Sequence, residues 1–295
     1  MNGKLRQLRG TALLVSSLLL GGPAPGEAGH EEVGVYEDWR TDDIVRADRW
    51  TGREAGGLEI LREVKGHKLL MRLRREGITV PILPAMPVSF ANNRLSFTDF
   101  SSVDHMEVDF KVRNLAVSDC PEAVPVRPVS NIGVGIQLNK FNDGPGGPGN
   151  STGDYIATIL AFRTTVNLGP GGVLVTDPEG VLRVRANLTR CLNAPCSTTS
   201  FPPVASFDFP ETVLVSEPFT LRLVWDEAGH RFLAGVGANP DVALSYPLTL
   251  NVKPAAGAPS GILFTGFAAN NCAAGLADAK VKVREVRTNT SGIVP

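Results

Sequence analysis

The chain has 295 residues, of which 29 are Lys or Arg and 30 are Asp or Glu, so its formal net charge is −1. This balance gives no electrostatic footprint for a nucleic acid or an anionic membrane surface. Hydrophobic residues make up 43% of the chain, which is long enough to bury a full core. We therefore expect a globular protein that has no nucleic-acid partner.

Residues 1–28 have the pattern of an export signal. A cluster of basic residues precedes a short apolar run over Thr11–Gly22, and small residues at Gly26 and Ala28 mark a cleavage site. Cleavage after Ala28 is favoured, because a cut after Ala24 would leave a proline as the first mature residue. The apolar run is about 12 residues, shorter than the roughly 20 that cross a bilayer, and no later stretch is better suited. We expect a secreted or periplasmic protein with no membrane span.

Apolar and polar residues alternate through most of the chain after the signal, and no helical stripe interrupts them. The clearest strand is Met106–Arg113, in which every second residue is apolar and the others are charged. The same alternation predicts strands over Asn131–Asn139, Leu182–Thr189 and Phe219–Trp225. Tyr155–Phe162 is apolar on both faces, which predicts a strand that is covered on each side.

Turn residues punctuate these strands. Asp177–Gly180 places Pro and Gly where a type I turn favours them, which predicts a hairpin between Val173–Thr176 and Val181–Leu188. Asp226–Gly229 is predicted to join the strands on either side of it in the same way. Many short strands at regular spacing indicate two stacked antiparallel sheets.

The fold is therefore predicted to be all-β, a two-sheet antiparallel β-sandwich. No repeat of fixed period is present, which argues against a propeller. No change in composition marks a linker, and the late strand Ala279–Val286 is too short to fold alone. We expect a single domain over residues 29–295, with its core over about 33–288.

An even number of cysteines in an exported chain favours two disulfides. Cys191 and Cys196 bracket the turn-forming stretch Leu-Asn-Ala-Pro, so they are predicted to pair, which leaves Cys120 with Cys272 by elimination. A zinc site is the alternative, and the distance of every histidine from a cysteine disfavours it.

The order of several motifs resembles the concanavalin A-like lectin/glucanase superfamily. The motifs are Tyr36–Trp39, Ile44–Trp50, Leu223–Asp226 and Ala279–Val283. The resemblance implies a jelly roll of two curved sheets in which the first and last strands pair. It also implies that a glycan is the commonest kind of ligand among the relatives.

Glucanases of the laminarinase type in that superfamily carry two catalytic carboxylates in a Glu-x-Asp-x-x-Glu or Glu-x-Asp-x-Glu strand motif. Glu107 and Asp109 begin such a motif, but Lys111 and Val112 occupy the positions of its last glutamate. A retaining glycosidase needs two carboxylates about 5 Å apart. Glu107 and Asp109 are therefore the catalytic candidates, and the incomplete motif favours a protein without catalysis.

Polar residues on two predicted strands are candidates for ligand binding. If the strands share a concave sheet, their amides and guanidinium groups would face a polar ligand. The residues are Gln137, Asn139, Arg183, Arg185 and Asn187. A plain solvated sheet face is the favoured alternative, because a sugar groove usually adds an exposed aromatic ring and Trp225 alternates with core residues.

No cofactor is predicted. Asn142, Asp143, Asn150 and Asp154 offer oxygen ligands for calcium, but their spacing matches no calcium loop, and such residues in a Gly-rich turn commonly bind the backbone. The four histidines belong to no catalytic or metal-binding constellation, and each is expected to be solvated.

Three functions remain open from the sequence. The preferred hypothesis is an exported, non-catalytic β-sandwich that binds a glycan or another extracellular polar ligand. The second is a glycoside hydrolase or lyase of the concanavalin A-like glucanase type. The third is an extracellular structural or adhesion protein, which would present an exposed apolar patch.

Overall fold

The structure is a computed structural model that describes thirteen stretches of the chain. These are residues 33–40, 44–57, 59–77, 88–98, 103–118, 129–140, 155–165, 167–168, 174–175, 177–192, 199–246, 260–269 and 274–290. The predicted export signal and the candidate calcium ligands Asn142, Asp143, Asn150 and Asp154 lie outside them. Within these stretches, no helix is long and apolar enough to span a membrane.

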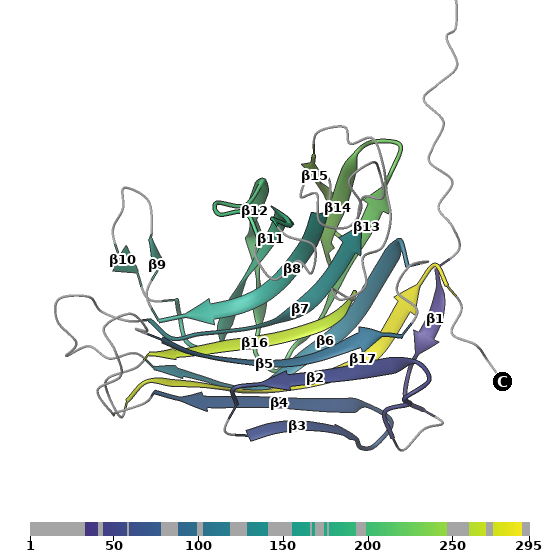
Figure 1. The fold of residues 1–295 in the computed structure, drawn as a ribbon. Helices are drawn as coiled ribbons and strands as arrows, with labels where there is room; N and C mark the ends of the chain where they lie inside the picture. The colour runs from purple at the N-terminus through teal and green to yellow at the C-terminus, as the bar shows by residue number, and fades with distance from the viewer. Residues whose placement is uncertain are drawn as a thin grey trace, which may run out of the picture. The chain divides into compact units, whose positions relative to one another are not determined.

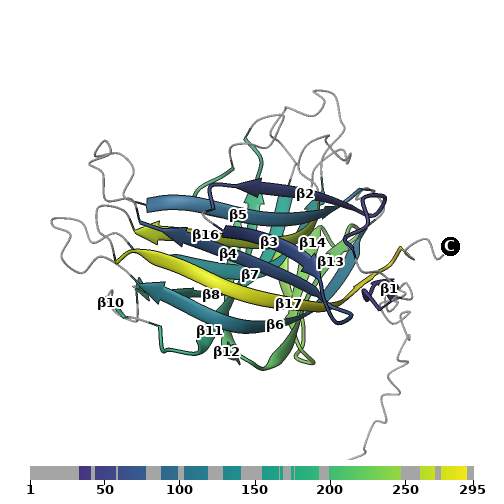
Figure 2. The same ribbon diagram turned by 90° about the horizontal axis from the view of Figure 1, so that it is seen from below.

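One sheet has eight strands, in the order β15-β14-β13-β6-β17-β4-β3, with β1 paired to β17. The strands are β1 (Gly34–Glu37), β3 (Glu59–Val64), β4 (Leu69–Glu76), β6 (His105–Ser118), β13 (Pro218–Asp226), β14 (Arg231–Val236), β15 (Val242–Ser245) and β17 (Leu276–Thr288). Figure 2 shows β4, β17 and β6 side by side in this layer.

The second sheet has seven strands, in the order β12-β11-β8-β7-β16-β5-β2 (Figure 1). They are β2 (Trp50–Ala55), β5 (Val88–Phe97), β7 (Asn131–Lys140), β8 (Tyr155–Thr164), β11 (Val181–Arg190), β12 (Ala205–Leu214) and β16 (Gly261–Ala269). A separate two-stranded pair is formed by β9 (Asn167–Leu168) and β10 (Leu174–Val175).

The core lies between the two large sheets, and period-two alternation explains why. Met106, Val108 and Phe110 of β6 are fully buried, while the charged residues between them lie on the outer face. Ile136 and Leu138 of β7 belong to the same hydrophobic cluster, so one core joins the two sheets. The predicted all-β, two-sheet antiparallel β-sandwich is confirmed.

Most of the predicted strands are confirmed. β6, β7, β11 and β13 coincide with the four alternating segments, and β8 lies between β11 and β7 with nearly all of its residues buried. β1 pairs with β17, as the resemblance implied for the first and last strands of the domain. β17 occupies the middle of its sheet, between β6 and β4, so the late strand does return to the sandwich.

The predicted hairpin around Asp177–Gly180 is wrong. β10 pairs with β9, whereas β11 pairs with β8 and β12. Asp177 explains the difference, because its carboxylate accepts a hydrogen bond from the backbone N–H of Thr164 at 3.0 Å and pairs with Arg183 Nε at 2.8 Å. The turn therefore attaches the start of β11 to the end of β8. The other predicted turn, Asp226–Gly229, does connect the paired strands β13 and β14.

Cys191 is the one cysteine within the described residues. It is fully buried, takes part in a disulfide, and forms a backbone bridge with Thr199. Cys120, Cys196 and Cys272 lie outside the described residues. The pairing of Cys191 with Cys196 and of Cys120 with Cys272 stays a prediction.

Candidate functional site

The outer face of the seven-stranded sheet brings the predicted binding residues together. β8 separates β7 from β11, and the register places both Gln137 and Asn187 opposite Thr158 of β8. In the same way, Asn139 lies opposite Ile156, which faces Thr189 on β11. Residues whose neighbours along the strand point into the core must themselves point outward. The polar residues of β7 and β11 therefore share one face of one sheet.

On β7 this face is buried and internally hydrogen-bonded. Gln137 is 5% exposed and Asn139 is 2% exposed. Arg94 Nη2 of β5 donates to Gln137 Oε1 at 3.2 Å, and Gln137 Nε2 donates to Asn139 Oδ1 at 2.9 Å. The favoured expectation of a plain solvated face is therefore wrong for β7, because both of its faces are covered.

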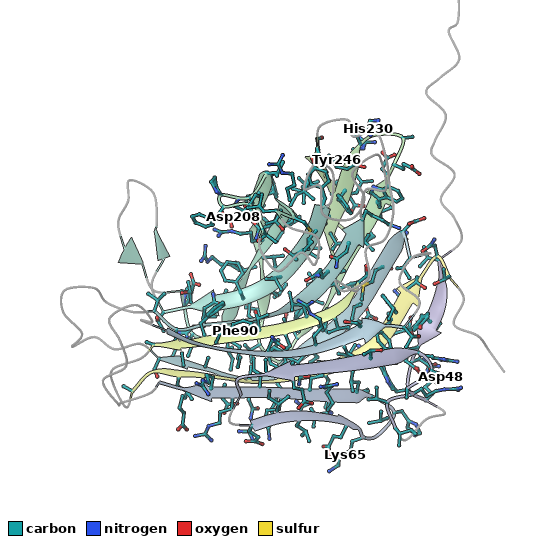
Figure 3. The ribbon with its side chains drawn as sticks, viewed as in Figure 1. Asp48, Lys65, Phe90, Asp208, His230 and Tyr246 are labelled. Atoms are coloured by element: carbon teal, nitrogen blue, oxygen red, sulfur yellow. The ribbon has the colours of Figure 1, made fainter. Side chains whose placement is uncertain are left out.

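On β11 the same face is more accessible, and its side chains are held in place by β12. Arg185 forms a bidentate pair with Asp208, with Nε–Oδ1 at 2.5 Å and Nη2–Oδ2 at 2.9 Å. Ser206 Oγ donates to Asn187 Oδ1 at 2.7 Å. Figure 3 shows Asp208 at this end of the sheet. These contacts orient the arginine and the asparagine before any ligand arrives.

An aromatic ring supports the two arginines of β11. The guanidinium carbons of Arg183 and Arg185 lie 4.8 Å and 5.5 Å from the ring centroid of Phe162 on β8. Both distances are within the range of a cation–π interaction. Phe162, Asp208 and Arg94 were not among the sequence candidates, because only the strand pairing shows that they adjoin those residues.

Trp225 was expected in the core and is only partly buried. Its Nε1 donates to the hydroxyl of Tyr246 at 2.9 Å, and Lys140 Nζ lies 4.4 Å from its ring centroid. Tyr246 also packs edge-on against His230, with their ring centroids 5.9 Å apart (Figure 3). Trp225 packs against the edge of the core and not within it, because it lies near the end of β13, next to the turn that follows.

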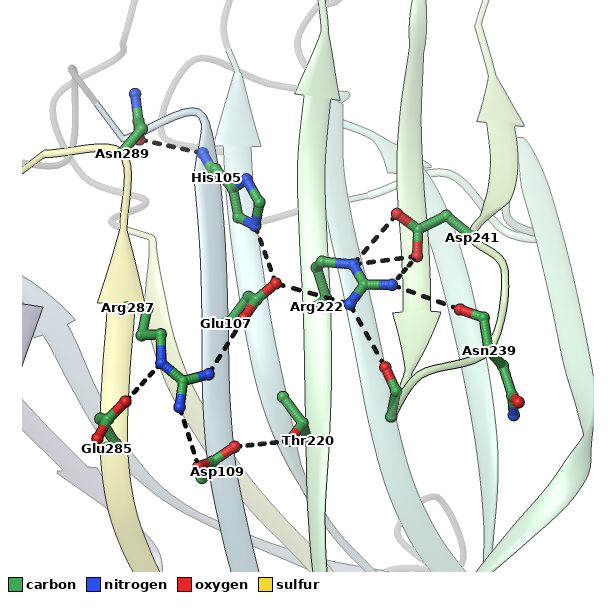
Figure 4. Close-up of polar contacts among 11 residues, drawn as sticks. His105, Glu107, Asp109, Thr220, Arg222, Asn239, Asp241, Glu285, Arg287 and Asn289 are labelled. Atoms are coloured by element: carbon green, nitrogen blue, oxygen red, sulfur yellow. Dashed lines mark hydrogen bonds and ion pairs between the residues drawn. The ribbon is translucent and has the colours of Figure 1, made fainter. Parts of the chain in front are cut away.

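The catalytic candidates lie on the other sheet. Glu107 and Asp109 are alternate residues of β6 and share the outer face of the eight-stranded sheet, where an ion-pair network surrounds them (Figure 4). Arg287 Nη1 lies 3.3 Å from Glu107 Oε2, and its Nη2 lies 3.4 Å from Asp109 Oδ2. Thr220 Oγ1 donates to Asp109 Oδ1 at 2.6 Å. Both carboxylates are therefore occupied by partners within the protein.

His105 belongs to the same network. Its Nε2 lies 3.3 Å from Glu107 Oε1, and its backbone N–H donates to Asn289 Oδ1 at 3.1 Å. The expectation that every histidine is solvated is wrong for His105, because the carboxylate of Glu107, two residues further along β6, holds its ring against the sheet. His67, by contrast, is exposed, and its Nδ1 lies 2.8 Å from the carbonyl oxygen of Arg40.

These partners lower the pKa of Glu107 to about 2, from an ordinary value of 4.5. The hydrogen bond from His105 contributes most, and the charges of His105 and Arg222 and a hydrogen bond from Arg287 add to it against the cost of burial. A general acid needs a pKa near the working pH. Glu107 is ionised at neutral pH and cannot donate a proton there.

We expect Glu107 to make the protein less stable in acid. Its folded pKa lies below its unfolded pKa, so its contribution is fully present above pH 4.5 and is lost as the pH falls toward 2. Glu107→Gln should lower the free energy of unfolding at pH 7 by about 1–2 kcal/mol, after allowance for solvent screening. Urea unfolding at pH 7 and pH 3 should show this difference shrinking by more than half. An equal loss at both pH values would contradict the assignment.

No family model matches the chain, and no curated protein matches it either. Solved structures with a similar fold include the Emp46p carbohydrate recognition domain in its potassium-bound form, with a TM-score of 0.41 and 10% identity over 88% of this chain and 97% of that one. SCLam, a non-specific endo-β-1,3(4)-glucanase from family GH16, has a TM-score of 0.41 and 11% identity over 87% and 90%. The VIP36 exoplasmic/lumenal domain has a TM-score of 0.36 and 10% identity over 86% and 88%. A likeness of this degree concerns the fold and does not transfer an activity.

Proposed function

We propose that the protein is an exported, non-catalytic β-sandwich that binds a glycan or another extracellular polar ligand on the outer face of the seven-stranded sheet. The observation that carries the proposal is the alignment of Thr158 and Asn187, neither of which is buried, in one row that begins at the buried Gln137 on β7. Amides and hydroxyls both donate and accept hydrogen bonds, as sugar hydroxyls do. Arg185 adds donors beside this row, because it lies two residues from Asn187 on the same face of β11.

The fixed orientation of the polar side chains also supports binding. Asn187 and Arg185 are each held by a partner on β12, so a ligand would meet donors and acceptors that are already oriented. The aromatic ring of Phe162 lies beneath the arginines rather than open to solvent, which fits a polar ligand better than a stacked sugar.

The geometry gives no support to catalysis at this face. A retaining glycosidase requires two carboxylates about 5 Å apart, one of them able to donate a proton. Within the described stretches, the carboxylates that contact the proposed site are Asp177 and Asp208, and each is paired with an arginine, Arg183 or Arg185. Glu107 and Asp109 lie on the opposite sheet, within their own network.

Binding can be tested with a panel of immobilised glycans, followed by thermal unfolding with each glycan that retains the protein. A ligand at about 100 times its Kd adds about 2.7 kcal/mol to the free energy of unfolding. Asn187→Ala should weaken binding about tenfold, because it removes an oriented amide from the row. Asn239→Ala, in the turn between β14 and β15, is the matched control and should bind as the unchanged protein does. Retention on no glycan, or equal weakening by both variants, would overturn the proposal.

A further inference from the structure

Five cationic side chains line a small hollow on the outer face of the eight-stranded sheet. They come from β6, from β17 and from the turn that precedes β4. The residues are Lys68, Lys111, Arg113, Lys282 and Arg284. Together with Pro218 they enclose a volume of about 140 Å³. Among the residues that the structure describes, no carboxylate lines it.

The strand register places like charges directly opposite each other. Lys282 of β17 pairs with Lys111 of β6. The pairs on either side of it, Val281 with Val112 and Val283 with Phe110, are apolar and point into the core. Like charges at directly opposed positions of an antiparallel pair destabilise a sheet. The fold alone therefore gives no reason for two lysines at this position.

Two β-bulges bring two arginines to the same place. The pairing of β6 with β17 shifts between Lys280 and Val281, which leaves Arg113 as the extra residue on β6. It shifts again between Val283 and Glu285, which leaves Arg284 as the extra residue on β17. A bulge redirects the side chain of its extra residue. Each bulge thus adds one arginine beside the lysine pair.

The positive charge of this hollow is not balanced within the described part of the protein. None of the five cationic side chains has an ion-pair partner among the residues that the structure describes, whereas Arg222 and Arg287 on the same face pair with Asp241 and Glu285. The pKa of Lys282 is lowered, first by burial and then by the charges of Arg113, Lys68 and Lys111.

We propose that this hollow binds a tetrahedral oxyanion, the sulfate or phosphate group of an anionic ligand. Lysine and arginine offer several charged N–H donors and no acceptor, which suits an oxyanion that accepts hydrogen bonds on every oxygen. Such an ion would neutralise the opposed lysines and convert a repulsive arrangement into a favourable one. The site lies on the sheet opposite to the proposed glycan-binding face, and neither depends on the other.

The test is thermal unfolding of the full chain in sodium sulfate and in sodium phosphate, against sodium chloride at equal ionic strength. Millimolar sulfate or phosphate should raise the Tm by several degrees and reach saturation, because the ion binds the folded state only. A rise that never saturates, as salt exclusion from the protein surface produces, would overturn the proposal.

Two variants separate binding from a general salt effect. Lys282→Gln should raise the Tm in dilute chloride, because it relieves the repulsion from Lys111, and should weaken the oxyanion effect at least tenfold. Lys65→Gln removes the same charge from an exposed residue near the same turn and should preserve the effect (Figure 3). Equal behaviour of the two variants would overturn the proposal.

Glucose 6-sulfate, glucose 6-phosphate and glucose distinguish the possible sources of the oxyanion. In the Asn187→Ala variant, stabilisation by one ester and not by glucose would assign the site to that ester, and equal stabilisation by all three would show that the site does not recognise the oxyanion. Asn187→Ala should leave the oxyanion effect unchanged, so failure of the glycan proposal and failure of this one give different results.

Discussion

Replacement of Phe110 with Ala is expected to lower the free energy of unfolding by about 3–5 kcal/mol. Phe110 is 0% exposed in β6, which lies between β13 and β17. Its ring centroid lies 5.8 Å from that of Phe219 on β13. Because close-packed strands on both sides restrict collapse around the vacated space, the variant should lose both the buried apolar surface and the packing contacts of the ring.

Urea unfolding followed by circular dichroism would measure this loss. Phe201→Ala is the matched control, since Phe201 is 96% exposed and its truncation should change the free energy of unfolding by less than about 0.5 kcal/mol. A loss below about 1.5 kcal/mol for Phe110→Ala would contradict the placement of this ring in a close-packed core.

Arg163→Met is expected to lower the free energy of unfolding by about 3 kcal/mol. Arg163 is 7% exposed near the end of β8. Its guanidinium donates to the carbonyl oxygens of Pro178 at 3.2 Å, Val117 at 3.2 Å and Asp177 at 3.3 Å. Val117 belongs to β6, so one side chain connects the two sheets and the turn before β11. Methionine has a similar length but leaves all three acceptors without this donor.

The geometry of the donors can be separated from their charge. Arg163→Lys keeps the charge, but it lacks the planar fork that reaches three carbonyls, so it should restore less than half of the lost stability. Arg185→Met removes an arginine from an exposed ion pair and should cost less than about 1 kcal/mol. Full stability of Arg163→Lys in urea unfolding would show that charge alone is sufficient at this position.

The sequence predicts the strands well because their signal is local. In β6, β7, β11 and β13, alternation reflects the pleat of each strand and the burial of one face, and neither requires knowledge of the partner strand. The hairpin at Asp177–Gly180 fails for the opposite reason. A turn signal shows where the chain bends but not which strand it joins next, and the contacts of Asp177 with Thr164 and Arg183 decide that.

The sequence also picked out polar residues that share one face, but it could not show their surroundings. Gln137 and Asn139 alternate with apolar residues and so were expected to meet solvent, yet Arg94 from a strand two places away in the sheet joins them in a buried network. Glu107 begins a catalytic motif in the sequence, and the structure gives it arginine partners more than a hundred residues away.

The alternation of apolar and polar residues is enough to predict that the chain forms β-strands and which side of each strand faces the core, because both follow from a period of two residues. The residues that meet across strands cannot be predicted in this way, because strand pairing and register depend on the packing of the whole sheet. Lys111 and Lys282 are 171 positions apart in the sequence, and a register interrupted by two bulges brings them together with Arg113 and Arg284.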